Sequence, residues 1–438
     1  MTCQSMNTCV ANIEGVVQFG ANAALVATAP GVSTKTAVAD AAGAYTFRDL
    51  PPGTWTLRPS AEEAAAYEYT PASVSVPLSG NGNTAFAPTM TREPLLSTTP
   101  WLPQCKSVNA GAAYTLLAQP ASAPASSASV VNTGMTGDEY LANTGFDASK
   151  LVPMPLPIAD GNVTSAAVCA ADAAYSVGPT SSRTTCWLVS CFSGQCPTKW
   201  GICSGTFVAD PSGQGRLLFL TATHCVAISS IATDIMLLTS SFVTCNRDAG
   251  VPSPSSKQGD GIFQPTALTM SRIDFTLGYG IKDGALIQLL ALSNTNLAYA
   301  KPVAVGAVTN AGLAANVPNF SAGFPQVDDG PGRIPTCTAA NLGNTNAIHY
   351  SRKNAVRTLV NIGIQVPGFS GCGGNSGGTV MDEAACVQWG VLSATSTLCN
   401  NGASTNTYSR IVATLNEVGV PFLSLASGLV AGQTLFVN

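Results

Sequence analysis

Residues 371–380 read GCGGNSGGTV and place a single serine, Ser376, among five glycines. Glycine loses more backbone entropy on folding than any other residue, so a dense run of it disfavours both helix and strand. Glycine also adopts backbone angles that other residues avoid, and it lets another chain approach closely. The stretch therefore predicts a tight turn that presents the Ser376 hydroxyl and neighbouring N–H groups to a bound molecule.

The composition indicates an exported, disulfide-bonded protein. Of the 438 residues 46% are hydrophobic and 10% are charged, and the net charge is −4. The 19 Lys and Arg residues are spread thinly and no apolar run reaches membrane length, so we expect neither a nucleic-acid nor a membrane partner. The fourteen cysteines include no C-x-x-C pair and there are two histidines, which favours disulfides over a metal site. We expect a secreted, extracellular or periplasmic protein whose signal peptide is not in this numbering, with no metal and no cofactor.

The chain divides into three predicted parts. Residues 1–95 alternate short β-rich segments with Gly- and Pro-containing turns, which is typical of a small β-sandwich. Residues 96–165 are predicted as a linker or extension, because 118–133 is rich in Ala, Ser and Pro. Residues 166–438 consist of short apolar segments broken by Gly, Pro, Asn and Ser, which predicts an all-β domain.

Two further residues are candidates for chemistry with Ser376. His224 ends an apolar segment directly before Cys225, and a disulfide to Cys203 would fix the position of its ring. Asp274 lies between two apolar residues, where burying a carboxylate is expensive unless it is paired. A serine hydroxyl is a weak nucleophile that needs an imidazole base, and the base needs an oriented acid. The pattern predicts this set in the chain order His, Asp, Ser.

Other assignments of the acid stay open. Asp234, Asp248, Asp260 and Asp283 are alternatives, although none combines the apolar flanks and the spacing of Asp274. The second histidine, His349, lies among polar residues and is predicted to have a surface role. Nearer the C-terminus, the apolar positions of residues 409–418 recur at helical spacing and predict a helix.

The segments THC, IDFTL and GNSGG resemble, in that order, the motifs of chymotrypsin-like serine peptidases. The stretch CSGTFV…LLFLTATHC…FVTCN…DFTLGYG is especially similar to bacterial lysyl endopeptidases. The resemblance implies two six-stranded β-barrels over about residues 170–425. It also implies a catalytic triad of His224, Asp274 and Ser376 in the cleft between the barrels. The backbone N–H groups of Gly374, Asn375 and Ser376 would form the oxyanion hole.

The same resemblance implies further pairings and a substrate pocket. Cysteines expected to form disulfides are Cys203–Cys225, Cys372–Cys399 and Cys337–Cys386, and a cysteine like Cys245 would bridge back to the segment before the first barrel. Residues expected to contact substrate are Ser370, Ser393, Thr395 and Asn406, with 407–411 on a strand behind the pocket.

Two departures from the family alter these expectations. Position 375 is Asn, where trypsin-like digestive enzymes carry an Asp that pairs with a newly cut N-terminal amine. A neutral amide cannot make that ion pair, so neutral hydrogen bonds must hold the loop. The predicted pocket positions Ser370 and Asn406 are also neutral, and a lysine or arginine side chain buried there would be unpaired. We therefore expect cleavage after uncharged residues.

Residues 40–55, DAAGAYTFRDLPPGTW, resemble a signature of carboxypeptidase-regulatory-like or prealbumin-like domains, which implies a non-catalytic scaffold at the N-terminus. The sequence as a whole predicts a secreted, monomeric serine endopeptidase acting on proteins or peptides through an acyl-enzyme. Two alternatives remain. The protein would be a catalytically inactive protease fold used for surface binding or adhesion, or residues 1–165 would be an inhibitory pro-region.

Overall fold

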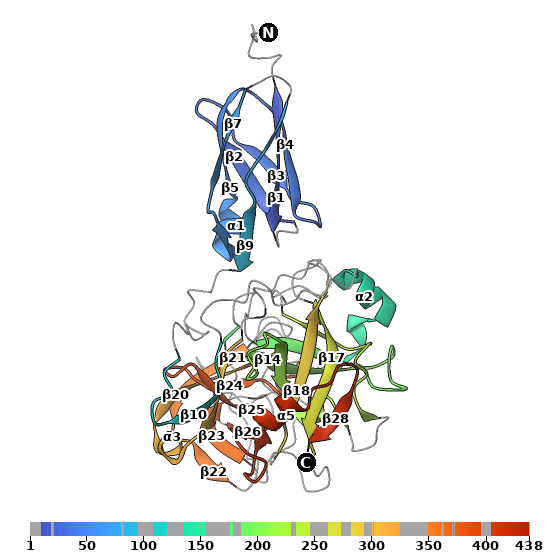
Figure 1. The fold of residues 1–438 in the computed structure, drawn as a ribbon, viewed down its shortest axis with the longest axis vertical. Coiled ribbons are helices and arrows are strands. Elements are labelled where there is room, and N and C mark those ends of the chain that lie inside the picture. The colour runs from blue at the N-terminus through green and yellow to red at the C-terminus, as the bar shows by residue number, and fades with distance from the viewer. Residues whose placement is uncertain are drawn as a thin grey trace.

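The computed structural model describes residues 10–18, 22–79, 83–94, 108–120, 135–154, 176–177, 185–228, 234–245, 262–272, 282–292, 300, 302–324, 349–360, 363–369, 371, 373–395 and 404–437. The predicted all-β class is confirmed, because nearly every described element is a strand and the few helices are short (Figure 1). No helix within these ranges is long and apolar enough to cross a membrane.

Residues 11–94 form two β-sheets that stand apart from the rest of the fold in Figure 1. One sheet has the order β4-β1-β9-β6 with β8 beside β1, and the other has the order β3-β2-β5-β7. In β7 buried and exposed residues alternate, as expected when one face of a sheet is covered. The fully buried Trp55 and Phe47 fill the core. The elements are β1 (Ala11–Gln18), β2 (Ala24–Thr28), β3 (Lys35–Val38), β4 (Ala44–Leu50), β5 (Gly53–Pro59), α1 (Ala61–Ala66), β6 (Tyr67–Thr70), β7 (Val74–Leu78), β8 (Thr84–Phe86) and β9 (Met90–Pro94).

A closed six-stranded barrel follows in the order β14-β13-β16-β17-β18-β15, and β15 pairs back onto β14. Its strands are β13 (Thr185–Ser190), β14 (Trp200–Val208), β15 (Leu217–Thr221), β16 (Phe242–Thr244), β17 (Ile262–Ser271) and β18 (Ala285–Ala291). The rings of Phe207 and Phe219 meet edge to face inside it, with centroids 5.4 Å apart. Cys245 is bonded to Cys186 in β13, so the bridge predicted to reach back before the barrel ends within its first strand.

The second half is a curved sheet of the order β12-β21-β20-β24-β25-β26-β23-β22. Through the described strands it is an open half-barrel, where the sequence predicted six closed strands. Its strands are β12 (Ser176–Val177), β20 (Val317–Gly323), β21 (His349–Ala355), β22 (Thr358–Val360), β23 (Gly363–Phe369), β24 (Thr379–Asp382), β25 (Val387–Thr395) and β26 (Ser404–Val412), with β19 (Ala304–Val308) against β25 and β27 (Val420–Pro421) against β26.

The helix predicted over residues 409–418 is wrong. Residues 404–412 are strand β26, and a turn follows them. Ile411 is buried in this strand, whereas Leu415 and Val418 lie beyond it and are 43% and 47% exposed. The strand predicted over 407–411 by family resemblance is therefore the correct assignment.

The described parts of residues 96–165 are built into both halves of the fold. Strand β10 (Tyr114–Ala118) pairs antiparallel with β19 of the second half, and β11 (Leu151–Pro153) pairs in parallel with β14 of the barrel. Helix α2 (Gly137–Thr144) begins with a capping box between Thr136 and Glu139. The Tyr140 hydroxyl of this helix donates to the Ser241 carbonyl over 2.6 Å.

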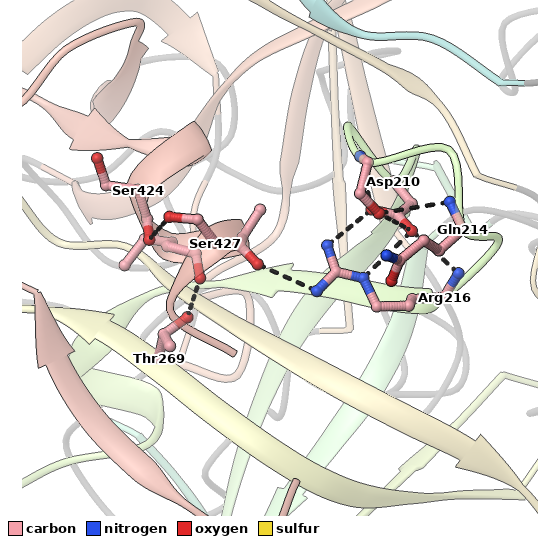
Figure 2. Close-up of polar contacts among 9 residues, drawn as sticks. Asp210, Gln214, Arg216, Thr269, Ser424 and Ser427 are labelled. Carbon is pink, nitrogen blue, oxygen red and sulfur yellow. Dashed lines mark hydrogen bonds and ion pairs between the residues drawn. The ribbon is translucent and has the colours of Figure 1, made fainter. Parts of the chain in front are cut away.

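The C-terminal segment covers the first barrel. Strand β28 (Thr434–Val437) pairs with β17. Helix α5 (Phe422–Ser427) also contacts β17, because the hydroxyl of Thr269 in that strand donates to the Leu425 carbonyl over 2.8 Å. Figure 2 shows Arg216 between two partners: it donates to both carboxylate oxygens of Asp210 and to the Ala426 carbonyl of α5. Burial raises the pKa of Asp210, but hydrogen bonds from Arg216 and Ser212 outweigh it and lower the pKa to about 2.

Candidate active site

His224 is held at the end of a barrel strand. It lies on the single turn η3 (Thr223–Cys225), which follows β15 directly. The predicted Cys203–Cys225 disulfide is present and joins this turn to β14. The Thr223 hydroxyl donates to the Gly284 carbonyl over 2.9 Å. The imidazole is therefore fixed from both sides, and the residue is 3% exposed.

Asp283 binds His224 through both carboxylate oxygens. Its Oδ2 lies 2.7 Å from His224 Nδ1, and its Oδ1 accepts the His224 backbone N–H over 3.0 Å. Complete burial raises the pKa of Asp283, but the His224 ring, Ser393 and the backbone N–H together hold it below its usual range. An ionised carboxylate at this position assigns the ring proton to Nδ1, which leaves Nε2 as the nitrogen that can accept a proton.

The acid beside His224 is thus Asp283, where the sequence motif predicted Asp274. Asp274 lies outside the described residues. Asp283 was among the alternatives, and its signal is the segment DGALIQLL, in which an acid and a glycine precede a strand, β18, that is buried at nearly every position. An acid at the start of such a strand can point into the interior, but the flanking pattern used to choose Asp274 does not detect it.

The Ser393 hydroxyl binds the same carboxylate, and the predicted contact of its strand with the substrate backbone stays a prediction. Its hydroxyl donates to Asp283 Oδ2 over 2.5 Å, and the residue is fully buried in β25. The side chain is therefore occupied with the acid. The Asp283 backbone N–H in turn donates to the Ser409 hydroxyl of β26 over 3.2 Å. Strands of the second half thus hold the acid of the first barrel in place.

Ser376 lies in a glycine turn that precedes β24. Gly374 and Gly377 have φ angles of +92° and +75°, the left-handed region that favours glycine. A Cβ atom on Gly377 would lie 2.2 Å from the Thr221 hydroxyl oxygen and 2.5 Å from the Ser204 carbonyl oxygen. No other residue fits there without a shift of the first barrel. Ser376 is fully buried, and its hydroxyl makes no hydrogen bond to any other described group.

Short links bring the Ser376 turn and the His224–Asp283 pair together. The Ser376 carbonyl accepts the Ser204 N–H over 2.8 Å, and Ser204 follows the cysteine bonded to Cys225, next to His224. The Gly377 N–H donates over 2.8 Å to the carbonyl of the residue that precedes Ser393. Ser376 and His224 are thus linked through one disulfide and a few backbone bonds where the two halves meet.

The predicted pocket residues Thr395 and Asn406 are neighbours. They pair in register between β25 and β26 and are both buried. A Cβ on Gly371 would lie 3.2 Å from Asn406 Oδ1 and 3.3 Å from Thr395 Cβ. The Asn406 amide donates to the Tyr408 hydroxyl over 3.2 Å, which orients the amide.

Several sequence predictions lie partly or wholly outside the described residues. Ser370, Cys337, Cys372 and Cys399 are in this group, so the Cys372–Cys399 pairing stays a prediction. Cys386 is disulfide-bonded, and its pairing with Cys337 stays a prediction. Asn375 is 6% exposed. His349 begins strand β21.

Among the described residues, the side chains that could jointly hold a metal ion are Cys203, His224 and Cys225, whose ligand atoms lie within 4.8 Å of one another. Both sulfur atoms belong to one disulfide and are not thiolates. This cluster therefore serves to hold His224 in position.

No known family profile matches the chain, and no curated protein matches it. Among solved structures, the chain is similar to one described as HL collagenase, with 17% identity and a TM-score of 0.36. The alignment covers 54% of this chain and 92% of the collagenase chain. A likeness of this degree does not indicate a function.

Proposed function

We propose that the protein is a serine endopeptidase in which Ser376 is the nucleophile, His224 the general base and Asp283 the orienting acid. The observation that carries the proposal is the 2.7 Å contact between His224 Nδ1 and Asp283 Oδ2, together with the backbone bonds that link this pair to the glycine turn of Ser376. A buried carboxylate that binds a histidine through both its ring and its backbone has a demanding geometry that packing alone does not require.

In the proposed reaction, Ser376 Oγ attacks the peptide carbonyl carbon while His224 Nε2 takes the hydroxyl proton. Asp283 keeps the proton on Nδ1 and stabilises the imidazolium that forms. Collapse of the tetrahedral intermediate breaks the C–N bond, and His224 gives its proton to the leaving amine. Water then attacks the acyl-enzyme with His224 as base, which releases the acid product and restores Ser376.

The negative oxygen of the tetrahedral intermediate would be bound by backbone N–H groups of the glycine turn. The expected donors are those of Gly374, Asn375 and Ser376. The left-handed φ of Gly374 supports this role, because such a backbone lets successive N–H groups point to one side.

The proposed substrates are proteins or peptides cleaved after uncharged residues. Among the described residues, the buried acids are Asp283 and Asp382, and each has a partner: His224 for the first, and Arg357 with Tyr114 for the second. Neither is available to bind a lysine or arginine side chain. Profiling with a peptide library tests this proposal, and a strong preference for Lys or Arg at the cleaved bond would contradict it.

The activity itself is tested with casein and a fluorophosphonate probe on oxidised, folded protein. We expect the wild-type protein to hydrolyse casein and to be labelled at Ser376, and Ser376→Ala to do neither. Ser427→Ala is the matched control, because it removes an exposed hydroxyl on α5 and should leave both results unchanged. Unlabelled Ser376 in folded wild-type protein would contradict the proposal.

One observation favours the alternative of an inactive binding protein: the Ser376 hydroxyl is fully buried in this structure. In that case the N-terminal sandwich would be the functional module, and casein hydrolysis would be absent from wild type and Ser376→Ala alike. The disulfides fit a protein that folds in an oxidising compartment, as either function would require outside the cell. We propose a monomer, which size-exclusion chromatography tests.

A further inference from the structure

Ser204 connects the glycine turn to two other segments through one buried hydroxyl. It lies in β14 and is fully buried. Its Oγ donates to the Gly374 carbonyl over 2.8 Å and accepts the Phe324 N–H over 2.7 Å. Its backbone N–H donates to the Ser376 carbonyl over 2.8 Å. Two carbonyls of the turn, on either side of Asn375, are thus bound to the same residue.

The bond to Gly374 fixes the direction of a peptide plane. In a trans peptide the C=O and the following N–H point in opposite directions within one plane. Holding the Gly374 carbonyl toward Ser204 therefore points the Asn375 N–H away from it. Gly374 has no Cβ to restrict its own rotation, and its φ of +92° is one of several conformations open to glycine. An external hydrogen bond is needed to select this one.

Asn375 increases the need for an external hydrogen bond to the turn. A charged residue at position 375 could anchor the turn by an ion pair, but the asparagine amide is neutral. Gly323 packs against both Asn375 and Ser204, since a Cβ on Gly323 would lie 3.1 Å from Asn375 Cα and 3.1 Å from Ser204 Oγ. The turn is thus held by a neutral hydroxyl and by close packing.

We propose that Ser204 is a positioning residue that holds the glycine turn in its oxyanion-binding conformation, in place of an ion pair at position 375. This inference rests on the proposed peptidase function. Ser204 touches no substrate in this role. It acts through the Gly374 carbonyl, and its loss should lower the rate of acylation far more than substrate affinity.

The test compares Ser204→Ala with Thr269→Val, a matched control that also removes a buried hydroxyl from a strand of the first barrel, on the side covered by α5 (Figure 2). We expect Ser204→Ala to lower kcat on a peptide ester or amide substrate by about 10- to 100-fold at nearly unchanged KM, below the loss on deleting an oxyanion donor outright. Thr269→Val should keep kcat within about twofold, since its hydroxyl has no link to the turn.

A second readout separates positioning from general destabilisation. A peptide aldehyde forms a tetrahedral adduct with an oxyanion on the serine, whereas the matching peptide alcohol binds without one. Ser204→Ala should weaken inhibition by the aldehyde by about 10-fold or more and leave inhibition by the alcohol unchanged. Equal weakening of both inhibitors would indicate a merely structural role and would overturn the inference.

If Ser204→Ala does not fold, Gly323→Ala tests the same contact while keeping the hydroxyl, because the added methyl presses on both Ser204 and Asn375. A lower kcat at unchanged KM supports the inference, and an unchanged kcat overturns it. A wild-type protein without activity would overturn the proposed function and this inference together. An active wild type with an unaffected Ser204→Ala would overturn the inference alone.

Discussion

Asp283 illustrates how much of the proposed chemistry depends on single residues. Its carboxylate accepts from the ring and the backbone of His224 and from the hydroxyl of Ser393, while its own N–H donates to Ser409. Removing one partner of a fully buried, hydrogen-bonded charge leaves the others unsatisfied. The acid is therefore the residue at which a conservative change should have the largest effect short of the nucleophile.

We predict that Asp283→Asn lowers kcat by roughly 10³- to 10⁴-fold, because an amide in this position favours the wrong tautomer of His224. Asp274→Asn is the comparison variant and should lose less than about tenfold. Steady-state kinetics on a peptide substrate measure both. A larger loss in Asp274→Asn than in Asp283→Asn would show that the acid has been assigned to the wrong residue.

Gly377 offers a prediction about the turn itself. Gly377→Ala adds a methyl 2.2 Å from the Thr221 hydroxyl oxygen and 2.5 Å from a backbone carbonyl, at a left-handed φ. We expect it to destabilise the fold by about 3 kcal/mol or more and to abolish activity. Gly213→Ala has nearly the same φ, +70°, in open space, so it should cost only about 1 kcal/mol. Urea unfolding gives both values, and equal losses would contradict the steric argument.

At this scale the sequence predicts residues that stand in local motifs. Ser376, His224 and the Cys203–Cys225 bridge were all evident from short segments, because glycine density and adjacent cysteines leave a local signal. Asp283 was not, since its partner His224 is 59 residues away and its direction depends on how β18 enters the barrel. Neither Ser204 nor the bond from the Ser393 hydroxyl to Asp283 is predicted, for the same reason, because a lone serine in an apolar strand has no distinguishing pattern.

The turn after β14 is held together by the charged side chain of Asp210. Asp210 accepts from the backbone and side chain of Ser212 and from Arg216, which also reaches the carbonyl of Ala426 in α5 (Figure 2). This arrangement connects a β-turn to the C-terminal helix through one guanidinium.

We predict that Asp210→Asn destabilises the protein by about 1 kcal/mol at pH 7, a modest value because the ion pair is partly exposed. The folded pKa of Asp210, about 2, lies below its ordinary value, so its stabilisation is present above about pH 4 and is lost as the pH falls toward 2. The difference in unfolding free energy between wild type and Asp210→Asn should therefore shrink over that interval. A difference that stayed constant from pH 7 to pH 2 would contradict this.

Strand β26 shows why element type was harder to predict than element position. Residues 409–418 carry apolar side chains at helical spacing, but β26 ends at Val412 and is bonded on both sides, to β25 and β23. The strand reads STNTYSRIV and has polar residues at buried positions, so no apolar alternation marks it in the sequence. Pairing with distant strands decided the structure.

At the scale of the whole molecule, the segment before the barrels is part of the folded core. Tyr114 of β10 donates its hydroxyl to Asp382 over 2.7 Å, and Asp382 also accepts from Arg357 over 3.4 Å. The guanidinium of Arg357 lies over the ring of Trp389, 4.8 Å from its centroid. Loss of β10 would remove a hydrogen bond from a buried acid and uncover part of this cluster.

We therefore predict that the active protein retains residues 108–154, against the alternative that all of residues 1–165 is an inhibitory pro-region. The measurement is intact mass under denaturing conditions after incubation, with activity assayed alongside. An active species that begins after residue 165 would contradict this prediction.

Tyr114→Phe should destabilise the protein by about 1.5–3 kcal/mol, as expected for a hydrogen bond to a charged group. Tyr45→Phe is its control, since that hydroxyl has no hydrogen bond to a described group, and should cost less than about 0.5 kcal/mol.

The division of the site between the two halves has a consequence for how the protein is made. His224 and Asp283 belong to the first barrel, but the hydroxyl that steadies Asp283 and the turn that carries Ser376 come from strands translated much later. A chain emerging from the ribosome folds its N-terminal parts first and at that stage holds a base without a nucleophile. If the proposed function holds, proteolytic activity would therefore begin only after the strands of the second half have been synthesised.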